Sequence, residues 1–426
     1  MHLLFLSQTF PDADHPTQGG YNVALCRALA LRHQVTAVSP RNWPQAMRHR
    51  ARGRSFTTVP TAGGAGMDCR YPTFWYAPGI RHVRHGAAMW RSVEKTVRDV
   101  HRRQPIDAVL SYWAHPDGEA GLQAARFAGA PHVVIVGGSD VLLLPNRPER
   151  CAVIRRVLRE SDGVMTVSEG LRRATIDLGA DEDRVHTIYQ GIDRDRFHSG
   201  DRKKARQRLG LPTDRALLFW VGRMVEVKRL DLLISACGEL QQSGLNFELC
   251  LAGDGPLRGA VEQQARQAGL SDRLRFVGSV RHEELPEWYR AADVTVLSSR
   301  SEGLPNVLRE SLACGTPFAS TDVGSIREIA DQAWSRLTPA GDSALLARAI
   351  IEVLESDCRD AAGHYRARSW DECAADVEAL FDRLRHAKSV PLKQQSLSGG
   401  TQSNTECAAS RCDESTVAAE YELVGK

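Results

Sequence analysis

The chain has 426 residues, of which 42% are hydrophobic and 25% are charged, with a net charge of +3. This composition is typical of a globular protein with room for two domains, and its small basic excess argues against a dedicated nucleic-acid binder. The ten Cys residues lack the Cys-x-x-Cys and Cys/His spacings of zinc sites. No stretch approaches the roughly 18 apolar residues of a membrane span, and residues 1–7 lack the flanks of a signal peptide, so we expect a cytoplasmic protein.

Short apolar runs alternate with helical patterns through the first half of the chain. This alternation predicts a parallel β-sheet covered by helices. About 50 residues after the second predicted strand are expected to be irregular. The predicted strands are residues 1–7, 34–39, 106–113, 132–136, 163–167 and 185–189, and the predicted helices include residues 21–31, 89–100 and 118–127.

Two glycines, Gly19 and Gly20, stand at the start of the first predicted helix. Glycine lets a ligand approach the backbone closely, and a helix N-terminus favours an anion. The segment lacks the Gly-x-Gly-x-x-Gly fingerprint of dinucleotide enzymes, so it gives little support to NAD binding. An ordinary turn is the alternative.

A basic cluster follows the second strand: Arg48, His49, Arg50, Arg52 and Arg54. It could contact anionic lipid or a phosphorylated acceptor. A solvated loop is the more common explanation of such a run.

His115 and Asp140 each follow a predicted strand. If the sheet is parallel, both lie at its carboxyl edge, where ligands bind in open α/β folds. A lone His is often a packing or surface residue, and Asp often caps a turn, so a structural role stays open for both.

The second half restarts the alternation, with strands predicted at residues 216–221, 247–252, 274–277 and 294–297. Arg223 follows the first of these strands, and Lys228 stands five residues further on. Two cations at a strand end are suited to binding a phosphate group. A solvated surface pair is the alternative.

The stretch 300–329 follows the last of these strands and carries two carboxylates, Glu302 and Glu310. Glu302 lies in the predicted loop, and Glu310 lies about a turn into the helix that begins near Asn306. The first N–H groups of that helix are donors suited to phosphate. Helix capping and a solvated helix face are the alternative roles of the two acids.

The spacing of Glu302 and Glu310, the segment Glu-Gly-Leu-Pro-Asn, and the later Gly315-Thr316-Pro317 turn resemble the retaining, GT-B-fold glycosyltransferases of family 4. The resemblance covers residues 1–386 and is strongest over 221–329. It implies an α/β protein with two Rossmann-like domains that face each other across a cleft. Ser325 and Arg327 depart from the family pattern, which has a second Gly and often a Pro there.

The resemblance also implies site residues. Arg223 and Lys228 would stabilise the diphosphate, Glu302 would orient sugar hydroxyls, Glu310 would contact the ribose, and His115 would lie near the transferring carbon. The remaining expected contacts to the donor nucleotide sugar are Gly19, Gly20, Val280, Gly303, Leu304 and Asn306.

The expected domains are an acceptor domain at 1–198, a nucleotide-sugar donor domain at 199–362, and a helix at 363–387 that crosses back onto the acceptor domain. Residues 388–426 are rich in Ser, Gln, Thr and Glu with few apolar residues, and we expect them to be disordered.

The predicted activity is that of a retaining hexosyltransferase that passes a sugar from a UDP- or GDP-sugar to a growing glycan or lipid-linked acceptor. No cofactor, metal or nucleic acid is expected. Residues 113–118 and 138–140 are similar to enzymes of bacterial surface polysaccharides, including the teichuronic-acid type. The basic cluster leaves open a peripheral contact at the inner face of the cell membrane. An epimerase or hydrolase on the same fold, and a silent nucleotide-sugar-binding scaffold, are the alternatives.

Overall fold

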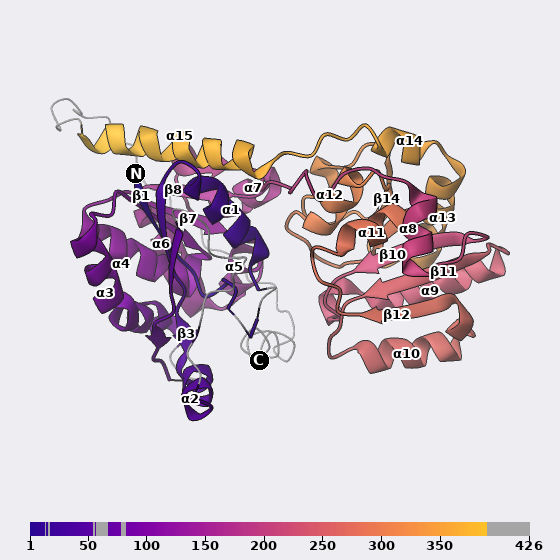
Figure 1. Cartoon of the computed structure of the whole chain (residues 1–426), viewed down its shortest axis with the longest axis horizontal. Helices are drawn as coiled ribbons and strands as arrows, with labels where there is room; N and C mark the ends of the chain where they lie inside the picture. The colour runs from indigo at the N-terminus through magenta and orange to yellow at the C-terminus, as the bar shows by residue number, and fades with distance from the viewer. Residues whose placement is uncertain (13, 16–17, 54–55, 57–66, 78–81, 390–426) are drawn as a thin grey trace. The chain divides into compact units, whose positions relative to one another are not determined.

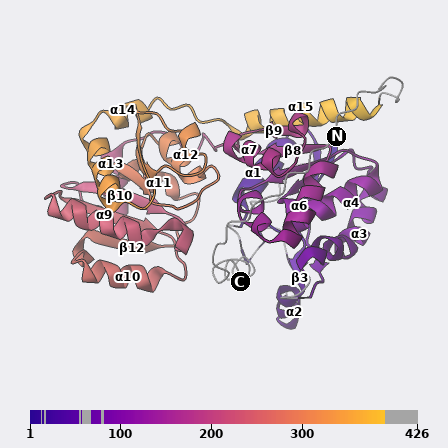
Figure 2. The same ribbon diagram turned by 180° about the vertical axis from the view of Figure 1, so that it is seen from behind.

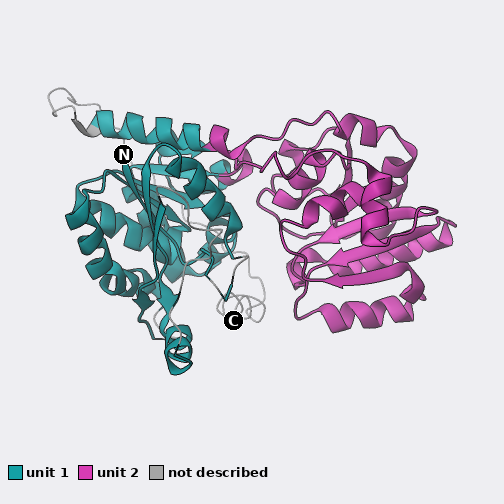
Figure 3. Cartoon of the chain, viewed as in Figure 1, with its two compact units in different colours: residues 1–166, 172–188, 374–426 teal, residues 167–171, 189–373 magenta. Residues whose placement is uncertain are grey.

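The computed structural model describes residues 1–12, 14–15, 18–53, 56, 67–77 and 82–389 (Figures 1 and 2). The chain divides into two compact units, which Figure 3 shows in different colours. Unit 1 comprises Met1–Thr166, Arg172–Ile188 and Ala374–Lys426, and unit 2 comprises Val167–Leu171 and Tyr189–Cys373. Arg54 and the predicted tail from residue 390 onward lie outside the described residues.

Unit 1 is built on a seven-stranded sheet with the order β4-β2-β1-β6-β7-β8-β9. All neighbouring strands are parallel, so each connection crosses over the sheet. β1 (His2–Leu6) and β7 (His132–Val136) are buried along their whole length, as expected of a parallel sheet covered on both faces. The other strands are β2 (Gln34–Val38), β4 (Met67–Arg70), β6 (Ala108–Tyr112), β8 (Gly163–Thr166) and β9 (Val185–Thr187), and a separate pair joins β3 (Arg41–Asn42) to β5 (Thr73–Phe74).

Apolar residues at helical spacing attach the helices of unit 1 to this sheet. In α3 (His85–Arg103), Met89, Val93, Val97 and Val100 are buried in one core cluster with β1 and β6 residues. The other helices are α1 (Gly20–Ala30), α2 (Trp43–Ala51), α4 (Glu119–Ala128), α5 (Ser139–Leu142), α6 (Pro148–Glu160) and α7 (Glu169–Asp177).

Unit 2 has a six-stranded parallel sheet with the order β12-β11-β10-β13-β14-β15. Its strands are β10 (Ala216–Val221), β11 (Phe247–Ala252), β12 (Leu274–Gly278), β13 (Val294–Leu297), β14 (Phe318–Thr321) and β15 (Ser335–Thr338). The helices are α8 (Arg202–Leu209), α9 (Leu230–Gln242), α10 (Arg258–Gln267), α11 (Leu285–Ala291), α12 (Asn306–Ala313), α13 (Ser343–Glu355) and α14 (Cys358–Ala362).

The division between the units falls inside the last helix, α15 (Trp370–Ser389), whose first turn belongs to unit 2 and whose remainder belongs to unit 1. Val377, Leu380 and Phe381 are buried. Glu378 pairs with Arg32 (2.9 Å), which anchors the helix on the end of α1. Of the described helices, none is long and apolar enough to cross a membrane.

The α/β prediction of two Rossmann-like sheets is confirmed. The expectation that about 50 residues after β2 are irregular is wrong, because this region contains β3, α2, β4 and β5. α2 buries none of its residues, so an apolar stripe could not reveal it. β4 is four residues long and only half-buried, and it therefore lacks the alternation of a surface strand.

Candidate active site

Most of the residues predicted to bind the donor lie on the loops at the carboxyl ends of β10 and β13 or on α12, which follows β13, and these two strands are neighbours in the sheet of unit 2. The loop after β13 touches the loop after β14 through its backbone. Ser325 N donates to Gly303 O (2.9 Å), and a Cβ at Gly324 would lie 1.8 Å from Glu302 O. Since Gly324 also has a φ of +58, this close approach requires glycine.

Lys228 and Glu302 come together as an ion pair in this region. Lys228 Nζ lies 2.6 Å from Glu302 Oε1, and the two side chains are 22% and 10% exposed. Ser299 Oγ donates to the same carboxylate oxygen (2.5 Å), and Ser298 Oγ donates to Lys228 O (2.9 Å). Serines that follow β13 therefore fix both partners of a charged pair that water only partly reaches.

Arg223 follows β10 and is exposed. The turn after β11 packs closely on the loop that carries Arg223. Gly253 in this turn has a φ of +132, and a Cβ there would lie 1.8 Å from Gly222 O. Val280 follows β12 and is half-buried. The close approach of Gly253 to Gly222 thus fixes the backbone of the loop that carries Arg223.

Glu310 lies in α12 and is buried, with both carboxylate oxygens engaged. Its Oε1 lies 2.8 Å from His282 Nε2, and its Oε2 accepts a hydrogen bond from Tyr289 Oη (2.9 Å). Burial and the charge of Glu310 raise the pKa of Tyr289 well above its ordinary value. Burial lowers the pKa of His282, but its hydrogen bond and charge interaction with Glu310 outweigh this effect and raise that pKa above 6.5.

His282 and Tyr289 are contacts of the predicted site that the sequence did not reveal. They stand 28 and 21 residues before Glu310. The one available signal was the position of His282 two residues after Val280.

The other predicted donor contacts lie between β13 and α12. Gly303 and Leu304 are half-buried in the loop. Asn306 is the first residue of α12, and its Nδ2 donates to Gln190 Oε1 (3.0 Å). At the start of α12, Leu308 N donates to Pro305 O (3.2 Å). The N–H groups before it are of the kind that a helix leaves without an internal partner, and such donors are suited to an anion.

Gly19 and Gly20 lie before and at the start of α1 in unit 1. Gly19 has a φ of +66, and a Cβ there would lie 2.3 Å from Thr9 O, whereas a Cβ at Gly20 would meet no atom within 4 Å. Gly19 is therefore required by the fold, and Gly20 leaves open space beside the helix N-terminus.

His115 lies in the segment Ala114–Gly118 that follows β6, has an extended backbone (φ -147°, ψ 133°) and is buried. Its Nε2 lies 3.0 Å from His82 O, and its Nδ1 lies 3.4 Å from Glu119 Oε2. Both ring nitrogens therefore face protein groups. Glu119 also pairs with Arg156.

Asp140 and Asp117 are buried next to this loop. Asp140 accepts hydrogen bonds from Ala114 N, Gly137 N and Gly138 N (2.9–3.0 Å), which matches the capping alternative. Burial raises the pKa of Asp117 to about 7, although Gln8 N donates to its carboxylate.

The part of the chain that the structure describes contains no group of three or more His, Cys, Asp or Glu side chains arranged to hold a metal ion. The carboxylate of Asp12 forms a buried ion pair with Arg41 (2.8 Å), and the side chains of Asp12 and Arg41 are 1% and 3% exposed. Burial raises the pKa of Asp12, but Arg41 and His15 outweigh it and hold that pKa below its ordinary value.

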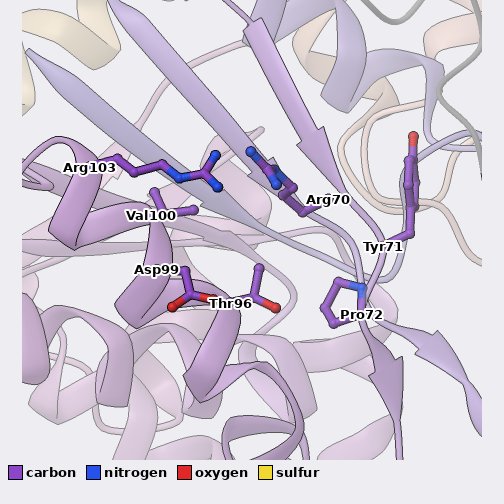
Figure 4. A pocket seen from close by; sticks show the side chains of 7 residues that line it. All are labelled: Arg70, Tyr71, Pro72, Thr96, Asp99, Val100 and Arg103. Atoms are coloured by element: carbon purple, nitrogen blue, oxygen red, sulfur yellow. The ribbon is translucent and has the colours of Figure 1, made fainter.

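A polar pocket of about 290 Å³ lies elsewhere in unit 1 (Figure 4). The guanidinium groups of Arg70 and Arg103 point toward each other across it. None of the predicted site residues lines this pocket; its lining consists of Arg70, Tyr71, Pro72, Thr96, Asp99, Val100 and Arg103.

Comparison with known proteins decides the family. A family model described as "Glycosyltransferase Family 4" matches residues 18–196, and one described as "Glycosyl transferases group 1" matches residues 201–370. A D-inositol 3-phosphate glycosyltransferase from Xylanimonas cellulosilytica is 34% identical over 349 residues, covering 77% of this chain and 78% of the relative. The chain belongs to glycosyltransferase family 4. It is therefore a glycosyltransferase of a retaining family and uses a nucleotide-sugar donor.

More distant relatives extend over almost the whole chain. TuaC of Bacillus subtilis, named for teichuronic acid biosynthesis, is 25% identical over 93% of this chain and 99% of the relative. The crystal structure of Anabaena HepE in complex with UDP-glucose matches 91% of the present chain and 99% of the HepE chain, with a TM-score of 0.65 and 19% sequence identity. The GT-B fold is thus confirmed.

Proposed function

We propose that this enzyme transfers a hexose from a UDP- or GDP-sugar to a growing glycan or a lipid-linked saccharide in polysaccharide biosynthesis, with retention of configuration. The observation that carries the proposal is the ion pair of Lys228 and Glu302 at the carboxyl ends of adjacent strands, with Glu310 on the next helix. UDP-glucose bound to HepE, a protein of the same fold, supports a UDP-sugar. The relationship to TuaC supports a polysaccharide pathway.

In the proposed donor complex, the diphosphate replaces Glu302 as the partner of Lys228, and Arg223 adds the second cation. The charge that develops on the leaving diphosphate is then stabilised by two fixed groups. Glu302, freed from Lys228, accepts hydrogen bonds from sugar hydroxyls. This change of partner is local, because Lys228 Nζ exchanges the carboxylate oxygen of Glu302, 2.6 Å away, for an oxygen of the diphosphate.

Glu310 accepts hydrogen bonds from the ribose, while Tyr289 keeps one of its oxygens. The backbone near Val280 contacts the base, and the N–H groups of Gly303 and Leu304 and the side chain of Asn306 complete the donor contacts. These roles place the donor on the unit that contains residues 199–362.

The acceptor domain in this proposal is residues 1–198, and α15 belongs to its fold from Ala374 onward. Gly19 and Gly20 are proposed to contact the diphosphate. His115 is proposed to lie near the transferring carbon, and since both of its ring nitrogens face protein groups, it contacts the sugar through a ring edge or after a rotation. The proposed location is the cytoplasm, at the inner face of the membrane when the acceptor is lipid-linked.

The test is thermal unfolding with a panel of UDP-, GDP-, ADP- and dTDP-sugars on the wild type and on Arg223→Gln. A donor at 100 times its Kd stabilises the native state by about 2.7 kcal/mol, which is about 5–10 °C for a domain of this size. Arg223→Gln is expected to lose most of this shift. Arg258→Gln is the matched control and is expected to keep the shift; the half-exposed side chain of Arg258 pairs with Glu262 (3.0 Å).

If no donor at millimolar concentration raises the melting temperature of the wild type, the donor site is wrong. For a donor that binds, release of UDP or GDP is followed with and without an oligosaccharide acceptor. NMR of the product gives the anomeric configuration. Epimer formed without acceptor contradicts transfer, and an inverted product contradicts retention.

A further inference from the structure

The polar pocket of Figure 4 is formed by the end of β4 and one face of α3. Arg70 is the last residue of β4, and Thr96, Asp99 and Arg103 follow one another along α3 at intervals of three and four residues. Side chains at this spacing lie on the same face of a helix. With a volume of about 290 Å³, the pocket is at the lower end of the range of small-molecule sites, which is about 300–1,000 Å³.

Two cations of the pocket face each other. The guanidinium groups of Arg70 and Arg103 point toward each other across it (Figure 4). Arg70 Nε and Nη2 both lie close to Asp68 Oδ2 (2.8 and 2.7 Å), which leaves Nη1 unused by this pair. Within the residues that the structure describes, the side chain of Arg103 has no hydrogen bond or ion pair. Like charges that face each other repel, and a bound anion would remove this repulsion.

Other groups of the pocket can accept hydrogen bonds or offer apolar contact. Asp99 Oδ1 accepts a hydrogen bond from Arg102, and in the described part of the chain its Oδ2 has no hydrogen-bond partner. The hydroxyl of Thr96 likewise makes no hydrogen bond to another described residue. Pro72 and the buried Val100 add apolar surface. The pocket therefore combines two cations with acceptors and an apolar wall.

We propose that this pocket binds a carboxylated sugar, such as a hexuronate, of the acceptor glycan. The carboxylate of the sugar lies between Arg70 and Arg103, because a guanidinium binds a carboxylate through two parallel hydrogen bonds. Ring hydroxyls donate to Asp99 Oδ2 and Thr96 Oγ1, and the C–H face of the ring packs on Pro72. The inference rests on the proposed function, since it needs a glycan as acceptor, and it adds that this glycan is acidic.

The lining favours an acidic sugar over other small ligands. A neutral sugar would leave the two guanidinium groups facing each other. Inorganic phosphate would satisfy the arginines, but the carboxylate of Asp99 would repel it, and it would fill only a part of the pocket. A ring that carries both a carboxylate and hydroxyls matches the cations and the acceptors together.

Tyr71 connects the pocket with the loop between β1 and α1. Its Oη donates to Pro11 O (2.8 Å), and the guanidinium of Arg41 lies over its ring, 5.0 Å from the centroid. Arg41 in turn donates to Gln8 O (2.9 Å) and Phe10 O (2.6 Å). The pocket therefore adjoins the loop that ends at the two glycines proposed to contact the diphosphate. It holds a sugar of the acceptor other than the one that is extended.

The experiment is isothermal titration calorimetry of the full chain, without any sugar nucleotide, with trigalacturonate, its methyl ester and inorganic phosphate. The ester keeps the sugar rings and removes their charges. Trigalacturonate is expected to bind about tenfold more tightly than the ester, which makes no hydrogen bond between charged groups, and more tightly than phosphate. Arg103→Gln is expected to weaken the binding of trigalacturonate about tenfold for the same reason.

The matched control is Arg98→Gln, which removes an exposed arginine of the same helix that pairs with Glu94 (2.7 Å) and does not line the pocket. This variant is expected to keep the affinity of the wild type. Equal affinities for trigalacturonate and its ester, equal losses in the two variants, or phosphate bound as tightly as the trisaccharide would each overturn the proposal. No binding of trigalacturonate at millimolar concentration would overturn it as well.

Donor-induced thermal stabilisation is measured on the wild type and on both variants. Arg103→Gln is expected to keep this shift, so that its loss of trisaccharide binding is distinct from damage to the donor site. A wild type without any donor shift contradicts the proposed function. A wild type that shows the shift but binds no trigalacturonate contradicts only the site for an acidic sugar.

Discussion

The ion pair between Lys228 and Glu302 allows structural and functional roles to be separated with one substitution, Lys228→Met. The change removes the ammonium group but keeps an unbranched side chain of similar length. It leaves the carboxylate of Glu302, which is 10% exposed, with Ser299 Oγ as its remaining polar partner of those described above. An unpaired carboxylate in this largely buried position lowers the free energy of unfolding.

The size of the effect follows from the burial of the pair. Removing one partner of a fully buried pair costs about 3–5 kcal/mol. Because Lys228 is 22% exposed, water relieves part of this cost, and we expect about 2 kcal/mol. In a domain of 150–250 residues this lowers the melting temperature by about 4–8 °C. Lys228→Met/Glu302→Gln removes the stranded charge and is expected to recover about half of the loss.

Differential scanning calorimetry of the wild type, Lys228→Met, Glu302→Gln and the double variant gives the coupling energy between the two side chains. We expect this energy to be about 1–2 kcal/mol. Arg258→Met breaks a half-exposed pair within one helix and should change stability by less than about 0.5 kcal/mol. The double variant should regain stability but show no donor-induced shift. Additive single substitutions would refute the ion-pair reasoning, and a full donor shift in Lys228→Met would refute contact with the diphosphate.

Three further predictions concern the loops and the titrating groups. Gly324→Ala should lose donor binding and about 2–4 kcal/mol of stability in urea unfolding, because its methyl group would overlap the loop between β13 and α12. The control is Gly269→Ala, which should cost only about 1 kcal/mol, because Gly269 has a similar φ of +68 but open space around it. The pKa of His282 in an NMR titration should exceed 6.5 and fall in Glu310→Gln, so its contribution to stability is complete below pH 6.5 and lost as the pH rises through the raised pKa. Asp12→Asn should cost about 3 kcal/mol at pH 7, because it removes the charge that neutralises a buried guanidinium. Since the pKa of Asp12 is lowered, the wild type should lose the part of its stability that depends on this pKa shift only as the pH falls below about 4.

The fold could be predicted from the sequence where local pattern and tertiary environment agree. β10 and β11 are apolar runs buried within a parallel sheet, and their bounds match the predicted strands. The loop that we propose to bind the donor was singled out by Glu302 and Glu310, whose spacing is local. Of the elements that were missed, α2 and β4 have too little burial to leave a periodic signal.

The environment of the predicted site residues depends on packing that sequence order does not show. His282 meets Glu310 only because the loop after β12 folds over α12. Similarly, His115 was singled out for its place at a strand end, but its burial against Glu119 could not be read from that place. Lys228 and Glu302 are 74 residues apart, and the order of β10 and β13 in the sheet is what joins them.

Each of the two units is made of segments that are not contiguous in the chain, and this affects the order in which the units can fold during synthesis. Unit 1 contains the first strand and also α15 from Ala374 onward, and unit 2 takes in Val167–Leu171, where Glu328 accepts hydrogen bonds from Glu169 N and Gly170 N. Domains generally fold as they leave the ribosome, N-terminal first. Here unit 2 can assemble before α15, whose Glu378 pairs with Arg32, is available to complete unit 1, so the part synthesised first is the last to be completed.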